Sequence, residues 1–443
     1  MPKWRWVMAQ LTRRLWVRAT LLGVLGILAA MLAAVAERYI PWTIPGSIGS
    51  DAVDSLLAII ASSMLSVTTF SLSVMVSAYG SATNNVTPRA TKLLIEDPLT
   101  QNVLATFIGS FLFSIVGLIV LKTGAYGDRG RVVLFVVTIA VIALVVVSLL
   151  RWIDHLTRLG RVGETTDRVE EATRRAIEAR LRAPCLGGKP LRAQHAAPPP
   201  GALAVTADRI GYILHIDMPA LSRLCEDRNT DMVLNAVPGT FVYPHVPLAF
   251  IPDLGKRDPG KRDPSKAEEV DTLRAAVCAA FSLGDERSFD QDPRFGLAVM
   301  SEIGCRALSP GVNDAGTAID VIGRVTRLLS LWAQGPAPER EGEEEGPEFP
   351  RIHVPPLDTA DLFEDSFMLM ARDGAGLIEV QLRLQKCLLA LSRMGDDAFR
   401  AAARLHSRMA LDRAEAAMVL EADKARLREL VRAHADPSAR APT

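Results

Sequence analysis

The chain has 443 residues and balances 50 Lys and Arg against 50 Asp and Glu, so its formal net charge is zero. This balance gives no reason to expect nucleic acid or another polyanion as a partner. Hydrophobic residues make up 49% of the chain, and the long apolar runs lie before residue 152, which divides the sequence into an apolar first part and a polar remainder.

Four segments of the first part are long and apolar enough to cross a bilayer, which takes about 20 predominantly apolar residues. They are expected at residues 19–36, 55–79, 101–121 and 132–150. A basic flank before the first segment would suit a cleaved signal peptide. However, the apolar run is long, and a Glu-Arg pair follows it where a cleavage site requires small residues. We therefore interpret the first segment as a retained helix and residues 1–152 as a membrane domain.

The Lys and Arg residues in the short flanks predict the orientation of these helices. The N-terminal flank and the stretch after the fourth segment are basic, whereas the loop between the first two segments carries Arg38 alone. The loop between the third and fourth segments argues the other way, because it carries Lys122, Arg129 and Arg131. Since the first helix usually dominates, we expect both termini in the cytoplasm.

The second segment is rich in hydroxyl groups. Its central stretch, "ASSMLSVTTFSLSVMVSAYGS" from Ala61 to Ser81, contains no charged side chain. On a helix that turns about 100° per residue, five hydroxyl residues fall on one face. We call this face the hydroxyl stripe; it consists of Ser62, Ser66, Thr69, Ser73 and Ser77.

Two interpretations of the hydroxyl stripe remain open. Small residues let helix backbones approach closely, and hydroxyls bond across a helix interface or back to a carbonyl one turn earlier, so packing is the stronger interpretation. The alternative is a wetted surface that lines a pore or a binding cavity. Small residues also form stripes on the first and third segments, which favours packing: Gly23, Gly26, Ala30 and Ala33, and Thr106, Ser110, Ser114 and Gly117.

Residues 81–100 connect the second and third segments. Pro88 ends any helix before it, and Asp97-Pro98 marks the turn into the third segment. The stretch between them has the period of a short amphipathic helix, although an ordinary connector is slightly favoured. After the fourth segment, residues 153–182 predict a continued helix with charges of alternating sign, and a Pro-rich linker follows to residue 201.

The polar remainder predicts a mixed domain. Residues 202–252 predict a small β module, because β-branched and aromatic runs flank the hairpin signal Pro238-Gly239. Residues 334–350 form an acidic, low-complexity linker that we expect to be disordered, and residues 351–443 predict a helical region. The expected fold is therefore an α-helical polytopic membrane domain with four transmembrane helices, followed by a cytoplasmic α/β domain with a small β module and a helical C-terminal part.

Residues 267–333 predict helices joined by a distinctive turn. Asp290 and Asp292 precede a helix that Pro293 begins, and Asp292 suits the cap position, where its carboxylate accepts backbone N–H bonds. The turn "SPGVND" follows this helix, and Asn313 or Asp314 caps the next one. The candidate residues of the turn are Ser309, Pro310, Asn313 and Asp314.

Three stretches resemble a known family: "TFIGSFLFSIVGL" in the third segment, "GYILHID", and above all "RALSPGVNDAGTAID" from Arg306 to Asp320. They are similar to the bacterial predicted membrane proteins grouped as domain of unknown function family number 2254, over most of the chain. The family pattern commonly has Asp-Pro after the Asn, where this chain has Asp314-Ala315, so the rigid helix start is lost and the cap is kept. The resemblance implies several membrane helices, a cytoplasmic domain and a place in the bacterial inner (plasma) membrane.

Cysteine and histidine usage points to no cofactor. The five cysteines form no C-x-x-C pair, and the seven histidines form no H-E-x-x-H motif, so the sequence shows no recognisable metal site. Free thiols are expected rather than disulfides. We expect the lipid bilayer and further copies of the chain as partners, and no nucleic acid. The sequence identifies no solute or ion.

Three classes of function fit these observations. The sequence favours an oligomeric channel or transport-related assembly with a cytoplasmic regulatory domain; no ionisable residue lies deep within the four spans, which argues against a proton-driven transporter. The first alternative is a membrane-anchored structural or signalling scaffold. The second is a membrane-tethered, metal-dependent enzyme that uses the acidic loops around Asp290 and Asp314. Helix caps explain these acids more simply, so we expect no catalytic residue.

Overall fold

The computed structural model describes residues 2–36, 50–124, 126, 128–191, 201–252, 264–336 and 346–435. The chain divides into two compact units. Residues 7–84 and 88–165 form the first, here called the bundle unit, and residues 1–6, 85–87 and 166–443 form the second, here called the α/β unit. Helices α1 (Lys3–Thr12) and α7 (Val162–Arg182) are each shared between the two units.

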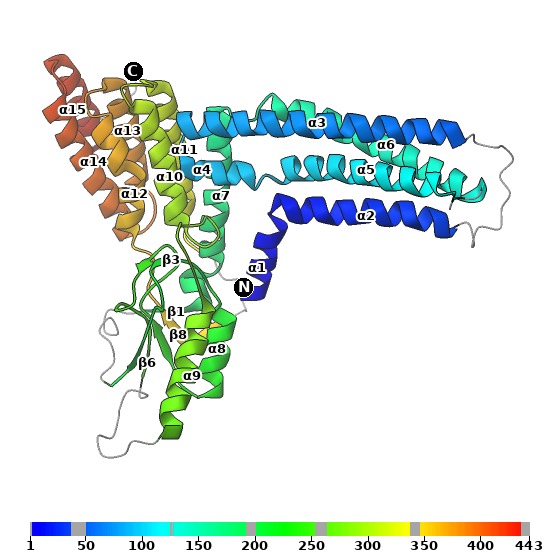
Figure 1. The fold of residues 1–443 in the computed structure, drawn as a ribbon. Helices are drawn as coiled ribbons and strands as arrows, with labels where there is room; N and C mark the ends of the chain where they lie inside the picture. The colour runs from blue at the N-terminus through cyan, green and yellow to red at the C-terminus, as the bar shows by residue number, and fades with distance from the viewer. Residues whose placement is uncertain are drawn as a thin grey trace. The chain divides into compact units, whose positions relative to one another are not determined.

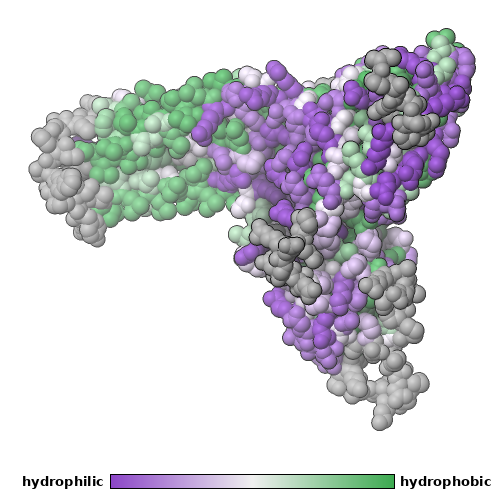
Figure 2. All heavy atoms as spheres, turned by 180° about the vertical axis from the view of Figure 1, so that it is seen from behind, coloured by the Kyte–Doolittle hydropathy of each residue, from purple (hydrophilic) through white to green (hydrophobic). Residues whose placement is uncertain are grey.

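The bundle unit is built on long apolar helices (Figure 1). Its helices are α2 (Leu15–Ala36), α3 (Ser50–Asn85), α4 (Pro88–Ile95), α5 (Pro98–Lys122) and α6 (Asp128–Leu156). Within the described ranges, four of them are long and apolar enough to span a membrane: α2, α3, α5 and α6. This confirms the four expected segments as long apolar helices; α3, α5 and α6 extend beyond both predicted limits, whereas α2 extends only at its N-terminal end. Figure 2 shows hydrophobic residues covering the visible face of these helices.

Glycines bring α2 and α5 into close contact. A Cβ atom on Gly26 would lie 2.7 Å from the carbonyl oxygen of Gly109, and one on Gly109 would lie 3.0 Å from the carbonyl oxygen of Leu22. Farther along α2, Ala30 is fully buried, and its carbonyl oxygen accepts a 2.6 Å hydrogen bond from the Tyr126 hydroxyl. The small residues predicted on the first segment thus serve helix packing.

Helix α3 packs through the face opposite to the hydroxyl stripe. Leu57 and Met64 are buried there. Leu57 belongs to a core cluster that includes Leu134 of α6, and Met64 belongs to a second cluster that includes Phe107 of α5 and Trp152 of α6. The bundle core is therefore made of large side chains on this side and of small ones between α2 and α5.

The connections differ from the sequence expectation at two points. The stretch between Pro88 and Asp97 is the amphipathic helix α4 rather than an ordinary connector, and the Asp97 carboxylate caps α5 by accepting from the Thr100 amide at 2.8 Å. The continuous helix expected over 153–182 is interrupted between α6 and α7. Gly160 there adopts φ +79°, which favours glycine, and a Cβ on it would lie 3.0 Å from the carbonyl oxygen of Ala78.

The α/β unit contains two sheets among its described residues (Figure 1). In the first, parallel pairs join β1 to β8 and β8 to β4, and antiparallel pairs join β4 to β6 and β6 to β2. Its strands are β1 (Gly188–Pro190), β8 (Phe349–Val354), β4 (Met232–Leu234), β6 (Pro247–Ile251) and β2 (Leu203–Thr206). The second sheet is antiparallel, with β3 (Gly211–Ile216) between β5 (Phe241–Val242) and β7 (Phe281–Gly284).

The predicted hairpin at Pro238-Gly239 is wrong. Strands β4 and β5, which lie on its two sides, belong to different sheets. The turn therefore leads the chain from one sheet to the other and does not join two paired strands. Gly239 adopts φ +93° and lies so close to Asp292 that a Cβ would be 2.3 Å from a carboxylate oxygen. The range 202–252 also holds helix α8 (Met218–Asp227), and its sheets are completed by strands from outside that range.

Helices complete the α/β unit. They are α9 (Pro264–Ala280), α10 (Pro293–Leu308), α11 (Ala315–Ala333), α12 (Thr359–Asp373), α13 (Ile378–Leu391), α14 (Asp397–Ala417) and α15 (Glu421–Ala435), with the 3-10 turn η1 (Pro184–Gly187). Buried residues of both sheets, α8 and α9 form one core. Aromatic contacts join α12 to α14, where the rings of Phe363 and Phe399 meet at 4.8 Å. Most of the expected acidic linker, residues 337–345, lies outside the described residues.

Candidate functional site

The hydroxyl stripe lies on the outer face of α3. All five of its residues are exposed in the single chain, whereas Thr68 and Ser71 on other faces are buried. Four of the five stripe hydroxyls donate to carbonyls of their own helix, with Ser62 donating to Ile59 at 3.2 Å. Ser66 donates to Ser62 at 3.1 Å, Thr69 to Leu65 at 3.0 Å and Ser73 to Thr69 at 3.1 Å.

Large apolar side chains flank the stripe on both sides. At 100° per residue, Leu65 and Val76 lie to one side and Phe70 lies to the other, with 54%, 66% and 63% of their surfaces exposed. The centre of this face is thus small and polar, and its edges are bulky and apolar. Because the hydroxyl protons are already used within the helix, the oxygens keep lone pairs for water, while the small residues leave room for a second helix.

The predicted acids at the start of α10 have structural partners. The Asp290 carboxylate accepts a 2.9 Å bond from the Trp6 indole nitrogen. Asp292 binds Arg287 through two hydrogen bonds of 2.7 and 3.0 Å and caps α10 by accepting from the Phe295 amide at 3.1 Å. Burial raises the pKa of Asp292, and the hydrogen bonds from Arg287 oppose that rise. The predicted cap is confirmed.

The contact at Asp290 is part of an N-terminal anchor. The Trp6 ring stacks on the fully buried His215 with 5.2 Å between ring centroids. The backbone amide of Lys3 donates to Asp217 at 2.6 Å, and the Lys3 ammonium donates to the carbonyl oxygen of Ala279 at 2.7 Å. Lys3 and Trp6 are therefore held by residues that follow them by more than 200 positions.

The turn after α10 is a capping structure. Ser309 ends α10, and Asn313 adopts the left-handed φ of +51°. Asp314 is the cap of α11, since its carboxylate accepts from the amide and the hydroxyl of Thr317 at 2.9 and 2.6 Å. Pro310 is exposed.

The two predicted acidic stretches do not meet. They lie at opposite ends of α10, whose 16 residues correspond to about 24 Å. Among the residues that the structure describes, no group of three or more His, Cys, Asp or Glu side chains could hold a metal ion. The geometry assigns helix caps to Asp292 and Asp314, an ion pair with Arg287 to Asp292, and a hydrogen bond from Trp6 to Asp290.

Replacing Asp314 with alanine should destabilise the α/β unit by about 1 kcal/mol, because α11 loses its cap. Hydrogen bonds from the Thr317 hydroxyl and amide lower the pKa of Asp314. The stabilisation that the Asp314 cap provides should therefore be complete above the pKa of the carboxyl in the unfolded chain, about 3.9. It should decline as the pH falls through the lower pKa of Asp314 in the folded state. Denaturant unfolding of wild type and D314A at a series of pH values measures the difference; a gap that stays constant below pH ~4 would contradict the assignment.

The match to known proteins covers most of these elements. The family described as "Predicted membrane protein (DUF2254)" matches residues 12–390. The chain belongs to this family. The resemblance seen in the sequence is confirmed, and the DUF2254 region includes the four long helices, both sheets, and α10 to α12.

Curated relatives are mycobacterial. The chain is 25% identical over 287 residues to an uncharacterized protein of Mycobacterium bovis (strain ATCC BAA-935 / AF2122/97) and equally to one of Mycobacterium tuberculosis (strain ATCC 25618 / H37Rv). Each match covers 64% of this chain and 53% of the relative, so it spans about half the length of those proteins. No solved structure matches the chain.

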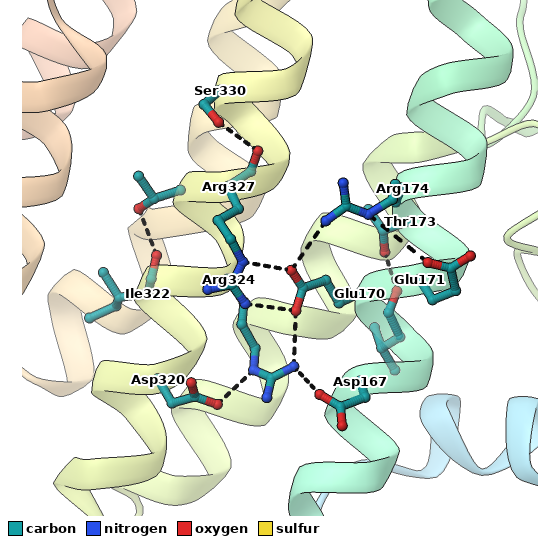
Figure 3. Close-up of polar contacts among 12 residues, drawn as sticks. Asp167, Glu170, Glu171, Thr173, Arg174, Asp320, Ile322, Arg324, Arg327 and Ser330 are labelled. Carbon is teal, nitrogen blue, oxygen red and sulfur yellow. Dashed lines mark hydrogen bonds and ion pairs between the residues drawn. The ribbon is translucent and has the colours of Figure 1, made fainter.

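The DUF2254 region also contains a charged cluster that sequence reasoning missed. It joins α7 to α11 and is here called the α7–α11 network (Figure 3). Glu170 lies at its centre and binds Arg324 and Arg327, each at 2.9 Å. Arg324 also binds Asp320 at 2.6 Å. The remaining members are Asp167, Glu171 and Arg174.

The centre of the α7–α11 network is shielded from water. The Glu170 and Arg324 side chains are only 10% and 14% exposed. Burial acts to lower the pKa of Arg324, but its hydrogen bonds to Asp320 and Asp167 outweigh this and raise the pKa above the usual value. The alternating charges of α7 were visible in the sequence; nothing there identified α11, more than 100 residues later, as the partner.

Proposed function

We propose that this chain is a subunit of an oligomeric, channel-like assembly in a bacterial inner membrane. In this proposal the hydroxyl stripe of α3 faces a polar path between subunits, and the α/β unit lies in the cytoplasm, where it gates or assembles the path. The observation that carries the proposal is the exposure of all five stripe residues on the outer face of α3.

Three features support this use of the stripe. The small residues of α2 and α5 are taken up by packing inside the bundle, whereas those on the stripe are exposed. Lipid offers hydroxyl oxygens no hydrogen-bond donors, so a polar row is better placed against water or another helix. The bulky edges formed by Leu65, Phe70 and Val76 are suited to contacts between neighbouring α3 helices around a closed, symmetric ring.

Orientation and location are part of the proposal. The basic N-terminal flank and the basic residues after the fourth span, Arg151, Arg158 and Arg161, favour the cytoplasmic side for both termini and hence for the α/β unit. The spans contain no ionisable group at depth, which fits passive passage of a neutral or weakly selected solute better than proton-driven transport.

Flux through liposomes that contain the purified full chain tests the proposal. We expect wild type to release a small entrapped solute or ion, and S66L, T69L and S73L to abolish release because leucine fills the path. The corresponding alanine variants should retain release. A143L is the matched control, since Ala143 is an exposed residue of α6 that takes the same added bulk away from the stripe.

Chemical crosslinking of the same samples reports on the assembly and should give oligomers for wild type and A143L alike. Lack of flux from wild type, or equal behaviour of the alanine and leucine variants, would reject the path and leave the anchored scaffold as the better account.

A further inference from the structure

The α/β unit contains a cavity that none of the sites above uses. Its volume is about 310 Å³, at the lower end of the range of small-molecule sites, roughly 300–1,000 Å³. It lies among the ends of α7 and α11 and the starts of α12 and α14. Apolar side chains form much of its lining, including Trp332, Leu357 and Phe399, and Arg180 and Asp396 supply charged groups.

Arg180 is a buried cation in the cavity lining, and it forms no ion pair with the described residues. The residue is only 6% exposed, and its Nη2 donates to the carbonyl oxygen of Gln291 at 3.0 Å. Nη1 is buried and has no hydrogen-bond acceptor among the described residues. A buried donor on a charged group without an acceptor is costly, so a native structure normally supplies one.

The nearest acidic residue does not fill this role. Burial lowers the pKa of Arg180, and the negative charge of the nearby Asp292 opposes this effect. Its carboxylate oxygens, however, already bind Arg287 and the Phe295 amide. The charge of Arg180 is therefore balanced only at a distance, so the cavity wall carries a cation with no bound carboxylate among the described residues.

The cavity wall also holds an unusual backbone. Cys185 and Leu186 of η1 both have left-handed dihedral angles, with φ of 50° and 58°. Such conformations are rare for residues other than glycine, and they cluster at ligand sites, where the surrounding structure maintains them. Here they place Cys185 in the lining beside Arg180.

We propose that this cavity binds a small organic monoanion, in which a carboxylate or similar group pairs with Arg180 and an aromatic or branched apolar body packs against Trp332, Leu357 and Phe399. An inorganic anion would leave the apolar lining without contacts, and a neutral apolar molecule would leave the charge of Arg180 without a counter-ion. Asp396, whose carboxylate caps α14 through the Phe399 amide at 2.8 Å, disfavours a second negative charge. The site stands whether or not the chain forms a channel.

Binding of a matched pair of probes tests this proposal. The probes are 3-phenylpropionate and the neutral 3-phenylpropan-1-ol, titrated into the full chain in lipid nanodiscs and followed by calorimetry and saturation-transfer NMR, with empty nanodiscs as the blank. We expect one acid to bind per chain, with the alcohol at least about tenfold weaker, as expected for loss of a charge-assisted hydrogen bond. Equal binding of the two probes, or no saturable binding of the acid, overturns the proposal.

Two variants separate the charge from the space. R180Q removes the cation and should weaken acid binding about tenfold or more while leaving the alcohol unchanged. A333F keeps Arg180 and fills the cavity at Ala333, which lines it, so both probes should be lost. R182Q, an exposed neighbour on α7 outside the lining, should bind as wild type. Undiminished acid binding by a folded A333F would overturn the proposal even where R180Q fails to fold.

Discussion

Replacing Gly26 with leucine should destabilise the bundle unit by about 3 kcal/mol or more, the upper end of the cost of overpacking. Even a Cβ at this position would lie 2.7 Å from the carbonyl oxygen of Gly109, and a backbone atom cannot swing aside as a side-chain tip can. The two helices must therefore separate along their closest contact. Thermal unfolding of the purified full chain in detergent, with limited proteolysis, measures the loss.

Gly80 provides a matched control for the same change. It lies in α3, also within a candidate membrane span, and a Cβ there would meet nothing within 4 Å. G80L should therefore unfold close to the wild-type temperature. If G26L and G80L unfold at the same temperature, the close approach of α2 and α5 does not determine the stability of the bundle.

Replacing Glu170 with glutamine should destabilise the α/β unit by about 3 kcal/mol, the lower end of the cost of breaking a buried ion pair, because the arginines around it are partly exposed. The change keeps the shape of the side chain and removes the charge that Arg324 and Arg327 share. Denaturant unfolding of the full chain in detergent, followed by a probe in the α/β unit, gives the difference.

The neighbouring residue supplies the control for this second prediction. Glu171 is 50% exposed and pairs with Arg175 at 2.8 Å on the same helix, so E171Q should cost less than about 1 kcal/mol. A double-mutant cycle of E170Q with R324Q isolates their coupling. Equal effects of E170Q and E171Q would show that burial of the α7–α11 network adds nothing to its strength.

Local chemistry made several elements predictable. The four long helices follow from uninterrupted apolar runs of sufficient length, which few other structures can accommodate. The cap at Asp292 follows from a carboxylate placed just before a helix start, where the first amide groups need acceptors, and the same argument limited the next cap to Asn313 or Asp314. In both cases the decisive partners lie within a few residues, so no knowledge of distant contacts was needed.

Contacts between distant parts of the chain were beyond prediction. Strand β1 has three residues, and its pairing with β8 joins Gly188 to Phe349; so short a stretch has no measurable period. The turn at Pro238-Gly239 was recognised, but β4 and β5 on its two sides pair with distant strands of different sheets, and the turn itself lies against Asp292, more than 50 residues later. Glu170 and Arg327 are likewise 157 residues apart.

Of the two candidate sites, the hydroxyl stripe was predictable from the sequence and the cavity beside Arg180 was not. The position of the hydroxyl stripe on one face of α3 came from the helical period alone, but its exposure depends on which faces α2, α5 and α6 cover. The cavity beside Arg180 had no signal in the sequence, because its lining comes from segments spread over more than 200 residues. Membership in the DUF2254 family supports the architecture, but it says nothing about the hydroxyl stripe or the cavity beside Arg180.

The N-terminal anchor has a consequence for biosynthesis. Trp6 is synthesised long before its partner Asp290, which follows it by 284 positions. Lys3 is likewise synthesised long before its partner Asp217, which follows it by 214 positions. The segment from Lys3 to Trp6 can therefore make these contacts only after the segments that contain Asp217 and Asp290 have been synthesised. A bulky group attached directly ahead of Lys3 would compete with these contacts, because the Lys3 amide itself donates to Asp217.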